Sequence, residues 1–268
     1  MADAKTMNSY AVRLDYGLSV VDAPATAQEV AAILTRPCFA ELSRLSARNK
    51  DRWSKSAKPT AEQIAAYLLD RANDAISLDT KRGGELVAGA EVENGIGRPG
   101  APVPQTRSAA YLVIPVVPAD RGPFVTGVCD LATALHAAAG FIAVEPSYAL
   151  AHRAALGGSR PKERVGLSEQ RFRERRGRGR FDDRLAAELA GIEWGTFLGP
   201  GHLAKIDLGS LRRSGAFARV VEVAPGLAYL QVTEDPVDDS TEGFELRLIA
   251  ARRVLAPLLM DVSAISLE

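Results

Sequence analysis

The sequence predicts an α+β fold in which helices pack on an antiparallel or mixed β-sheet. Three observations lead to this class. Residues 10–21 alternate roughly between apolar and polar side chains, as a strand with one buried face does. Apolar side chains between Phe124 and Ala138 recur at helical spacing, which predicts a core-facing helix. Pro225-Gly226 separates two β-patterned runs, 219–223 and 227–233, and indicates a hairpin.

The N-terminal part carries two helix-start signals. Thr26 with Glu29, and Thr60 with Gln63, match the capping box, in which a hydroxyl accepts from an orphan helix N–H and the second side chain reaches back. We expect helices to begin at both places. Residues 39–56 between them are basic and amphipathic, which predicts a solvated helix face. A nucleic-acid patch is the alternative, but Trp53 is the only aromatic residue among the positive charges.

The glycine- and proline-rich stretch 83–107 contains a formal G-x-G-x-x-G at Gly95–Gly100. A dinucleotide site needs a helix that starts inside this motif, and the prolines that follow prevent one. We therefore expect a hairpin loop with arms at 86–93 and 109–117. Pro115 in the second arm has no N–H and predicts a sheet edge or a bulge. Gly140 is expected to cap the end of the helix that starts near Phe124.

Residues 157–184 are polar, and an arginine-rich tract, RFRERRGRGR, lies at Arg171–Arg180. One interpretation is an RNA-binding arm, and the other is a mobile surface loop whose charge is offset by acidic residues on both sides. We favour the loop because acidic residues flank the tract. A short helix is expected at 182–190, and a last amphipathic helix is expected to begin near Phe244.

Two segments share a plan of strand, loop and helix. One consists of the strand 111–117 and the helix from Phe124, and the other consists of the strand 227–233 and the helix from Phe244. This echo suggests an internal duplication. We expect a single α+β domain over residues 1–268, built from two pseudo-repeat halves, 1–150 and 185–263, that the basic loop 157–184 joins.

Charge and composition exclude some partners. The 33 Lys and Arg residues balance the 33 Asp and Glu residues, so any electrostatic role must be local. The N-terminal residues 1–14 lack the apolar segment of a secretion signal. The most apolar run, 131–144, is too short to span a bilayer. We therefore expect a cytoplasmic protein without a membrane partner.

Signals for catalysis are weak. The sequence has no G-x-S-x-G elbow, Walker loop or H-E-x-x-H motif. His136, His152 and His202 are far apart in the sequence, and Cys38 and Cys129 suit neither a disulfide framework nor a zinc site. We expect a protein that is not an enzyme and that needs no cofactor or metal.

An acidic loop between the second hairpin strand and the last helix is the more informative constellation. The simplest interpretation is a polar loop whose acids complement the helix dipole. Metal binding is a second interpretation, although the spacing does not match an EF-hand. A third is a surface that presents carboxylates to a basic protein partner. The candidate partner-binding residues are Glu234, Asp235, Asp238, Asp239 and Glu242.

Four C-terminal segments of packing residues and turns carry a family resemblance. They are GIEWGTFLGP at 191–200, LRRSGAF at 211–217, GLAYLQVTEDP at 226–236 and ARRVLAPLLMD at 251–261. In these segments the chain resembles the TsiV-like immunity proteins of type VI secretion, long known as a domain of unknown function. The first half agrees in outline only, and the basic insertion at 171–180 departs from the expected pattern.

The resemblance implies a non-catalytic protein that protects its producer by binding a toxic effector. Named members of the group are associated with nuclease toxins. Because a nuclease has a basic substrate groove, the acidic loop could occupy that groove in place of phosphates. We therefore expect an immunity protein that blocks the active site of a cognate effector toxin. Nucleic-acid binding through Arg171–Arg180 and an uncharacterised enzyme are the alternatives, and the first is disfavoured by the flanking acids.

Overall fold

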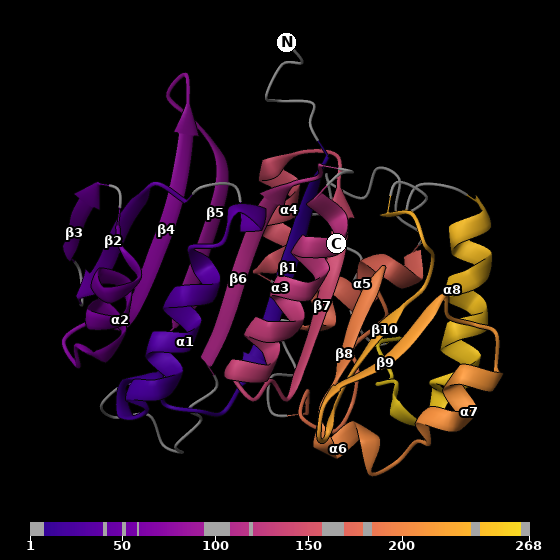
Figure 1. The fold of residues 1–268 in the computed structure, drawn as a ribbon. Helices are drawn as coiled ribbons and strands as arrows, with labels where there is room; N and C mark the ends of the chain where they lie inside the picture. The colour runs from indigo at the N-terminus through magenta and orange to yellow at the C-terminus, as the bar shows by residue number, and fades with distance from the viewer. Residues whose placement is uncertain are drawn as a thin grey trace.

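The computed structural model describes residues 8–39, 42–49, 52–57, 59–93, 108–117, 120–156, 169–178, 184–236 and 242–263. In these ranges ten strands form one sheet in the order β3-β2-β4-β5-β6-β1-β7-β8-β10-β9, and every neighbouring pair is antiparallel (Figure 1). The α+β class is thus confirmed, with the sheet antiparallel. The strands are β1 (Ser9–Tyr16), β2 (Arg44–Asn49), β3 (Arg52–Ala57), β4 (Ala75–Arg82), β5 (Glu85–Glu93), β6 (Ser108–Pro115), β7 (Ala139–Glu145), β8 (Gly195–Leu198), β9 (Arg219–Ala224) and β10 (Leu227–Gln231).

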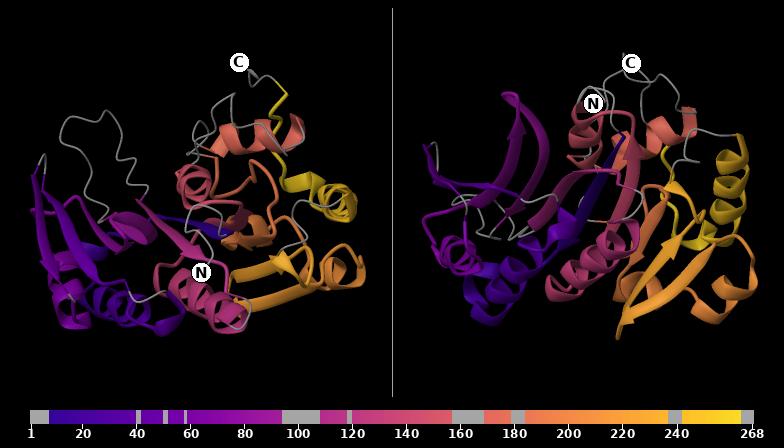
Figure 2. Two further views of the ribbon diagram at one scale, coloured as in Figure 1. Left: turned by 90° about the horizontal axis from the view of Figure 1, so that it is seen from above. Right: turned by 45° about the horizontal axis from the view of Figure 1, so that its top comes forward.

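Helices cover both faces of this sheet. Figure 2 shows α1, α2 and α3 on one side and α4, α5 and α8 on the other, while the short α6 and α7 lie near the β9–β10 end. The helices are α1 (Pro24–Leu34), α2 (Ala61–Leu69), α3 (Arg121–Ala134), α4 (Tyr148–Ala155), α5 (Glu169–Arg178), α6 (Pro200–Leu203), α7 (Leu208–Arg213) and α8 (Glu242–Val254). No helix in the described ranges combines the length and the apolar character that a bilayer-spanning segment needs.

Strand β1 is the centre of the sheet. It pairs with β6 along its whole length, from Ser9 opposite Pro115 to Tyr16 opposite Ser108, and with β7 on its other edge. Its alternation is confirmed, but both faces are buried. Tyr10 faces the main core, where its ring stacks on Phe124 of α3 with centroids 4.2 Å apart. The opposite face belongs to a smaller core beneath α4.

The prediction of a helix at 39–56 is wrong, because residues 44–49 and 52–57 form strands β2 and β3. Leu45 and Ala47 are the buried residues of β2, and they stand two positions apart, which is the period of a strand. Strand β4 supplies the partner that stabilises β2. The apolar run in this stretch is too short to distinguish the period of a helix from that of a strand, so pairing with β4 decides which of the two forms.

Two further expectations are corrected by tertiary packing. Gly140 does not cap α3 but lies inside β7, where a Cβ would come within 2.8 Å of the Arg13 carbonyl oxygen. Helix α3 ends before His136, which itself takes a left-handed φ of 50°. Pro115 marks neither an edge nor a bulge. It is the last residue of β6, an inner strand, and a strand end tolerates a missing N–H.

The hairpins expected from the turn signals are confirmed. Strands β9 and β10 flank Gly226, whose φ of 77° requires a residue without a Cβ. Strands β5 and β6 are the predicted arms, while the connection with the motif Gly95–Gly100 lies outside the described residues. Residues 184–187 form a turn where a short helix was expected. Both units of the internal echo exist, as β6 with α3 and β10 with α8, and their duplication stays a prediction.

The two capping boxes have opposite outcomes. At α2 the box is formed: the Gln63 amide donates to Thr60 Oγ1 at 3.3 Å, and the Thr60 amide donates to Gln63 Oε1 at 3.1 Å. At α1 the prediction is wrong, because the helix already begins at Pro24. A proline fits the first helical position, where its missing N–H is not needed.

This contrast gives a test. We expect Thr60→Ala to lower the free energy of unfolding by about 1 kcal/mol, the usual loss when a cap is removed. Thr26→Ala is the matched control, and it should be neutral or slightly stabilising because Thr26 lies inside α1, where alanine is the better helix former. Urea denaturation followed by circular dichroism measures both changes. Equal effects of the two substitutions would contradict the assignment of the caps.

Candidate functional site

Two of the five predicted acidic residues, Glu234 and Asp235, follow closely after β10. Glu234 and Asp235 are exposed there, and we call these two residues the carboxylate rim. Glu242 is the first residue of α8, and its side chain is not among those described. Asp238 and Asp239 lie outside the described residues. The structure therefore places two of the five candidate side chains next to each other and leaves the other three untested.

The carboxylate rim is tied to the start of α3. Arg121 donates from one guanidinium nitrogen to the Glu234 carbonyl oxygen at 2.9 Å, and the same nitrogen lies 3.6 Å from Asp235 Oδ1. Both side chains of this ion pair are partly exposed, so the pair contributes little to stability. Its effect is positional: it joins residues 113 positions apart and offsets part of the Asp235 charge.

Buried hydrogen bonds fix the backbone beneath the rim. The indole N–H of Trp194 donates to the Thr233 carbonyl oxygen at 2.9 Å, and the Gln231 amide donates to the same oxygen at 2.8 Å. The Thr233 hydroxyl donates to the Asp235 carbonyl oxygen at 2.9 Å. Trp194 is fully buried. The two carboxylates are therefore presented by backbone that the core holds in place, which lowers the entropy lost on binding.

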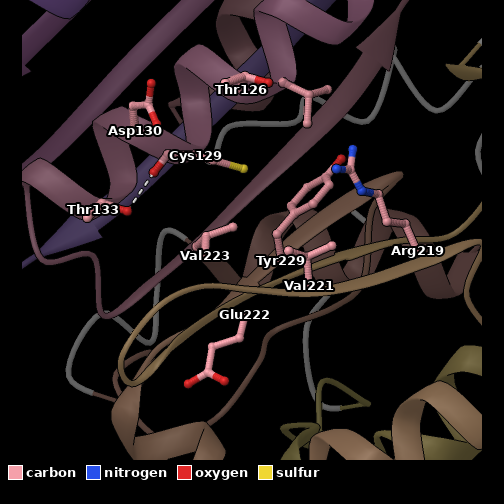
Figure 3. A pocket seen from close by; sticks show the side chains of 10 residues that line it. Thr126, Cys129, Asp130, Thr133, Arg219, Val221, Glu222, Val223 and Tyr229 are labelled. Carbon is pink, nitrogen blue, oxygen red and sulfur yellow. Dashed lines mark hydrogen bonds between the residues drawn. The ribbon is translucent and has the colours of Figure 1, made fainter.

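A groove of about 280 Å³ lies between α3 and the outermost strand β9 (Figure 3). This volume is just below the range of ~300–1,000 Å³ usual for small-molecule sites, and it suits a side chain of a partner. Val221 and Val223 form one wall, and Cys129 faces them from α3. Arg219, opposite Gln231 in the strand register, places one mouth of the groove near the rim. The lining residues are Val125, Thr126, Cys129, Asp130, Thr133, Arg219, Val221, Glu222, Val223 and Tyr229.

The Cys129 thiol and the Tyr229 phenol that line the groove are neutral at physiological pH. Burial is the main cause that raises the pKa of Cys129 to about 12. The charge of Arg219 lowers this pKa and the charge of Asp130 raises it, both by less than burial does. Burial also raises the pKa of Tyr229 well above its ordinary value. A protonated thiol is a poor nucleophile. The groove therefore offers no thiolate for nucleophilic attack, and its lining combines the apolar Val125, Val221 and Val223 with the charged Asp130, Arg219 and Glu222.

The three histidines do not converge on a site. His136 and His152 are exposed, while His202 is fully buried, and its Nδ1 accepts a hydrogen bond from the Gly199 amide at 3.2 Å. Burial lowers the pKa of His202. Among the described residues, no group of three or more His, Cys, Asp or Glu side chains is placed to hold a metal ion.

The arginine tract is the largest departure from expectation. Residues 169–178 form helix α5 where a loop was expected, and Arg171 and Arg175 of this helix are buried. Arg171 Nη2 lies 3.1 Å from Glu193 Oε2, and Arg175 Nε lies 3.0 Å from Glu193 Oε1. Arg175 also contacts Glu145 at the end of β7. These two arginines bind carboxylates of the same chain, so neither is available to a phosphate backbone.

A second, partly buried ion pair fastens the same helix to α8. The guanidinium of Arg252 binds Glu174 through two hydrogen bonds of 2.8 Å and 3.0 Å, the bidentate geometry in which arginine binds carboxylate most strongly. Glu174 is itself buried. The signal that sequence reasoning missed is the spacing of Arg171, Glu174 and Arg175, which puts three charges on one face of a helix.

Comparison with known proteins gives one informative result. No family model matches the sequence, and no curated protein matches it either. Among solved structures, the fold is similar to that of the Pseudomonas aeruginosa type VI secretion system (T6SS) protein PA0821, with a TM-score of 0.59. The match covers 94% of this chain and 73% of that chain, at 14% sequence identity. At this identity the comparison shows a fold shared with a T6SS protein.

The buried ion pairs lead to a prediction on stability. We expect Glu193→Gln to lower the free energy of unfolding by about 3–5 kcal/mol, because two buried guanidinium groups lose the carboxylate between them. Glu169→Gln removes the exposed pair of Glu169 with Arg173 and should cost less than about 1 kcal/mol. Urea denaturation compares the two variants. A loss at Glu193 no larger than the loss at Glu169 would refute the structural role of the cluster.

His202 leads to a prediction on pH. Because its pKa is lowered in the folded protein, the unfolded chain binds a proton below about pH 6.5 that the folded chain does not. This contribution to stability is present above that pH and is lost as the pH falls, by at most about 1.4 kcal/mol per pH unit. We expect His202→Asn, whose amide oxygen can still accept from Gly199, to weaken the pH dependence of unfolding between pH 7.5 and 5.5. His152→Asn, at an exposed site, should leave it unchanged.

Proposed function

We propose that this protein is an immunity protein that binds a cognate type VI effector toxin, with a nuclease as the first candidate, and neutralises the toxin by covering its active site. The proposal includes that the protein catalyses no reaction. The observation that carries it is the fold shared with a T6SS protein over 94% of the chain. The resemblance of residues 191–261 to TsiV-like immunity proteins supports the same role.

The carboxylate rim supports the mode of binding. Glu234 and Asp235 are exposed and consecutive in the chain, and the Trp194–Thr233 hydrogen bond holds the backbone next to them. Exposed charges of one sign accelerate association with a partner of the opposite sign. A nuclease offers such a partner surface, because it must attract the phosphates of its substrate. The rim therefore suits the first encounter with a basic active-site groove.

The described part of the arginine tract supports protein binding over nucleic-acid binding. An RNA-binding arm requires guanidinium groups that reach phosphates, whereas Arg171 and Arg175 are buried against Glu193. Arg173 is only partly exposed and pairs with Glu169. Labelled DNA and RNA should therefore show no salt-dependent retardation by the protein.

The direct test starts from the neighbouring open reading frame, which we expect to encode the toxin domain. Co-expression of this protein should rescue cells from that toxin, and the two purified proteins should form a complex in which the toxin is inactive. Rescue without complex formation would contradict neutralisation by binding. Turnover of the toxin or of its substrate by this protein alone would contradict a non-catalytic role.

The rim gives a quantitative prediction. We expect the double variant Glu234→Gln, Asp235→Asn to slow association with the toxin by about tenfold at low ionic strength, with a smaller effect at physiological salt. Stopped-flow or surface-plasmon kinetics at two salt concentrations measure this change. Glu62→Gln is the control, since Glu62 is an exposed acid on α2, far from the rim along the sheet. Unchanged association rates would remove the rim from the interface.

A further inference from the structure

Strand β9 ends the sheet with an edge that pairs with no other strand in the described residues. Tyr229 of β10 lies opposite Val221, and the neighbouring residues Val220 and Glu222 direct their backbone groups to the other side. Arg212 confirms this direction, because its Nε donates to the Val220 carbonyl oxygen at 3.3 Å. No backbone hydrogen bond from another described residue reaches this edge. Outward N–H and C=O groups of this kind are a template for a further strand.

The side chains of β9 distinguish its two faces. Val221 and Val223 are half-buried and line the α3–β9 groove opposite Cys129. Glu222 is exposed, and Figure 3 shows it directed away from Cys129. A strand added to this edge would alternate in the same way, with every second side chain over the groove.

Charge indicates which strand fits. Glu222 makes no ion pair with another described residue, and its carboxylate is exposed beside the edge. The residue paired with Glu222 in an added strand lies within about 5.5 Å on the same face, where an opposite charge is favourable and a like charge is not. The part of the groove beside it is lined by Val221, Val223 and the protonated thiol of Cys129, and Asp130 and Arg219 are among the other lining residues. The edge therefore selects a segment in which a basic residue alternates with apolar ones.

We propose that an extended segment of the effector toxin adds to the edge of β9, displaces the Arg212 side chain from the Val220 carbonyl oxygen, inserts an apolar side chain between Val221 and Cys129, and pairs a lysine or arginine with Glu222. This inference rests on the proposed function and identifies the edge of β9, with the groove beside it, as the surface that binds the toxin. The carboxylate rim lies near the Arg219 end of the same groove, so one partner can contact both.

The first experiment needs no substitution. Hydrogen exchange of the wild-type protein is measured alone and with the neighbouring toxin domain, and exchange in residues 219–224 should slow by about tenfold or more as the Val220 and Glu222 amides become paired. Strand β3, the opposite sheet edge, is the internal control and should not change. Strand addition is overturned if the β9 amides exchange as fast in the complex as they do in the protein alone.

The second experiment places a charge in the groove. Val221→Asp should raise the dissociation constant for the toxin domain by at least about 30-fold, the effect of an interface hot spot. Leu86→Asp is the matched control, because Leu86 is an exposed apolar residue on β5 and should leave binding unchanged. Circular dichroism and the melting temperature establish that both variants are folded.

The outcomes separate this inference from the proposed function. If the wild-type protein binds the toxin and Val221→Asp binds equally well, the groove is overturned and the proposed function stands. If the wild-type protein does not bind the toxin, both fail. If β9 is already protected from hydrogen exchange without toxin, and sedimentation shows that the protein self-associates as its concentration rises, the occupant is a second copy of this chain. This outcome also overturns the inference.

Discussion

Glu193 is the point on which the arrangement of the C-terminal half depends. Its two oxygens bind Arg171 and Arg175, so one buried carboxylate holds helix α5 against the sheet. A charge taken out of water costs several kcal/mol unless it is paired with good geometry. Helix α5 is therefore stable only in the position where its two arginines reach Glu193. The next residue, Trp194, points elsewhere and supports the end of β10. Two consecutive side chains, Glu193 and Trp194, thus connect helix α5 with the backbone next to the carboxylate rim.

The last two strands of the sheet, β10 and β9, differ in how deeply they are buried. Strand β10 is buried throughout, whereas β9 beside it is half-buried and bears the groove. Tyr229, fully buried, forms the floor that both share, and a Cβ at Gly195 would come within 2.8 Å of its ring. The last strand of the sheet is therefore the less buried of the two, and in the proposed complex a partner would reach β9 without rearranging the core.

Sequence reasoning succeeded where a local signal and the tertiary structure agree. The alternation in β1, the helical stripe of α3, the capping box at Thr60 and the hairpin at Gly226 are all decided within a few residues. It failed where distant partners decide. Leu45 becomes a strand residue because β4 lies beside it, and Arg171 becomes a core residue because Glu193, 22 positions away, neutralises it. The edge role of β9 could not be read from the sequence, since it depends on the order of all ten strands.

The place of β1 has a consequence for synthesis on the ribosome. This strand is translated before every other described strand, yet its neighbours β6 and β7 begin only at Ser108 and Ala139. At about 5–20 residues per second, β1 waits roughly 5–20 s for its first partner to emerge. During that time Tyr10, Val12 and Leu14 have no sheet to bury them, and pairing across such long loops is intrinsically slow. A nascent chain of this topology is therefore a natural client for chaperones that shield apolar segments until the central strand is enclosed.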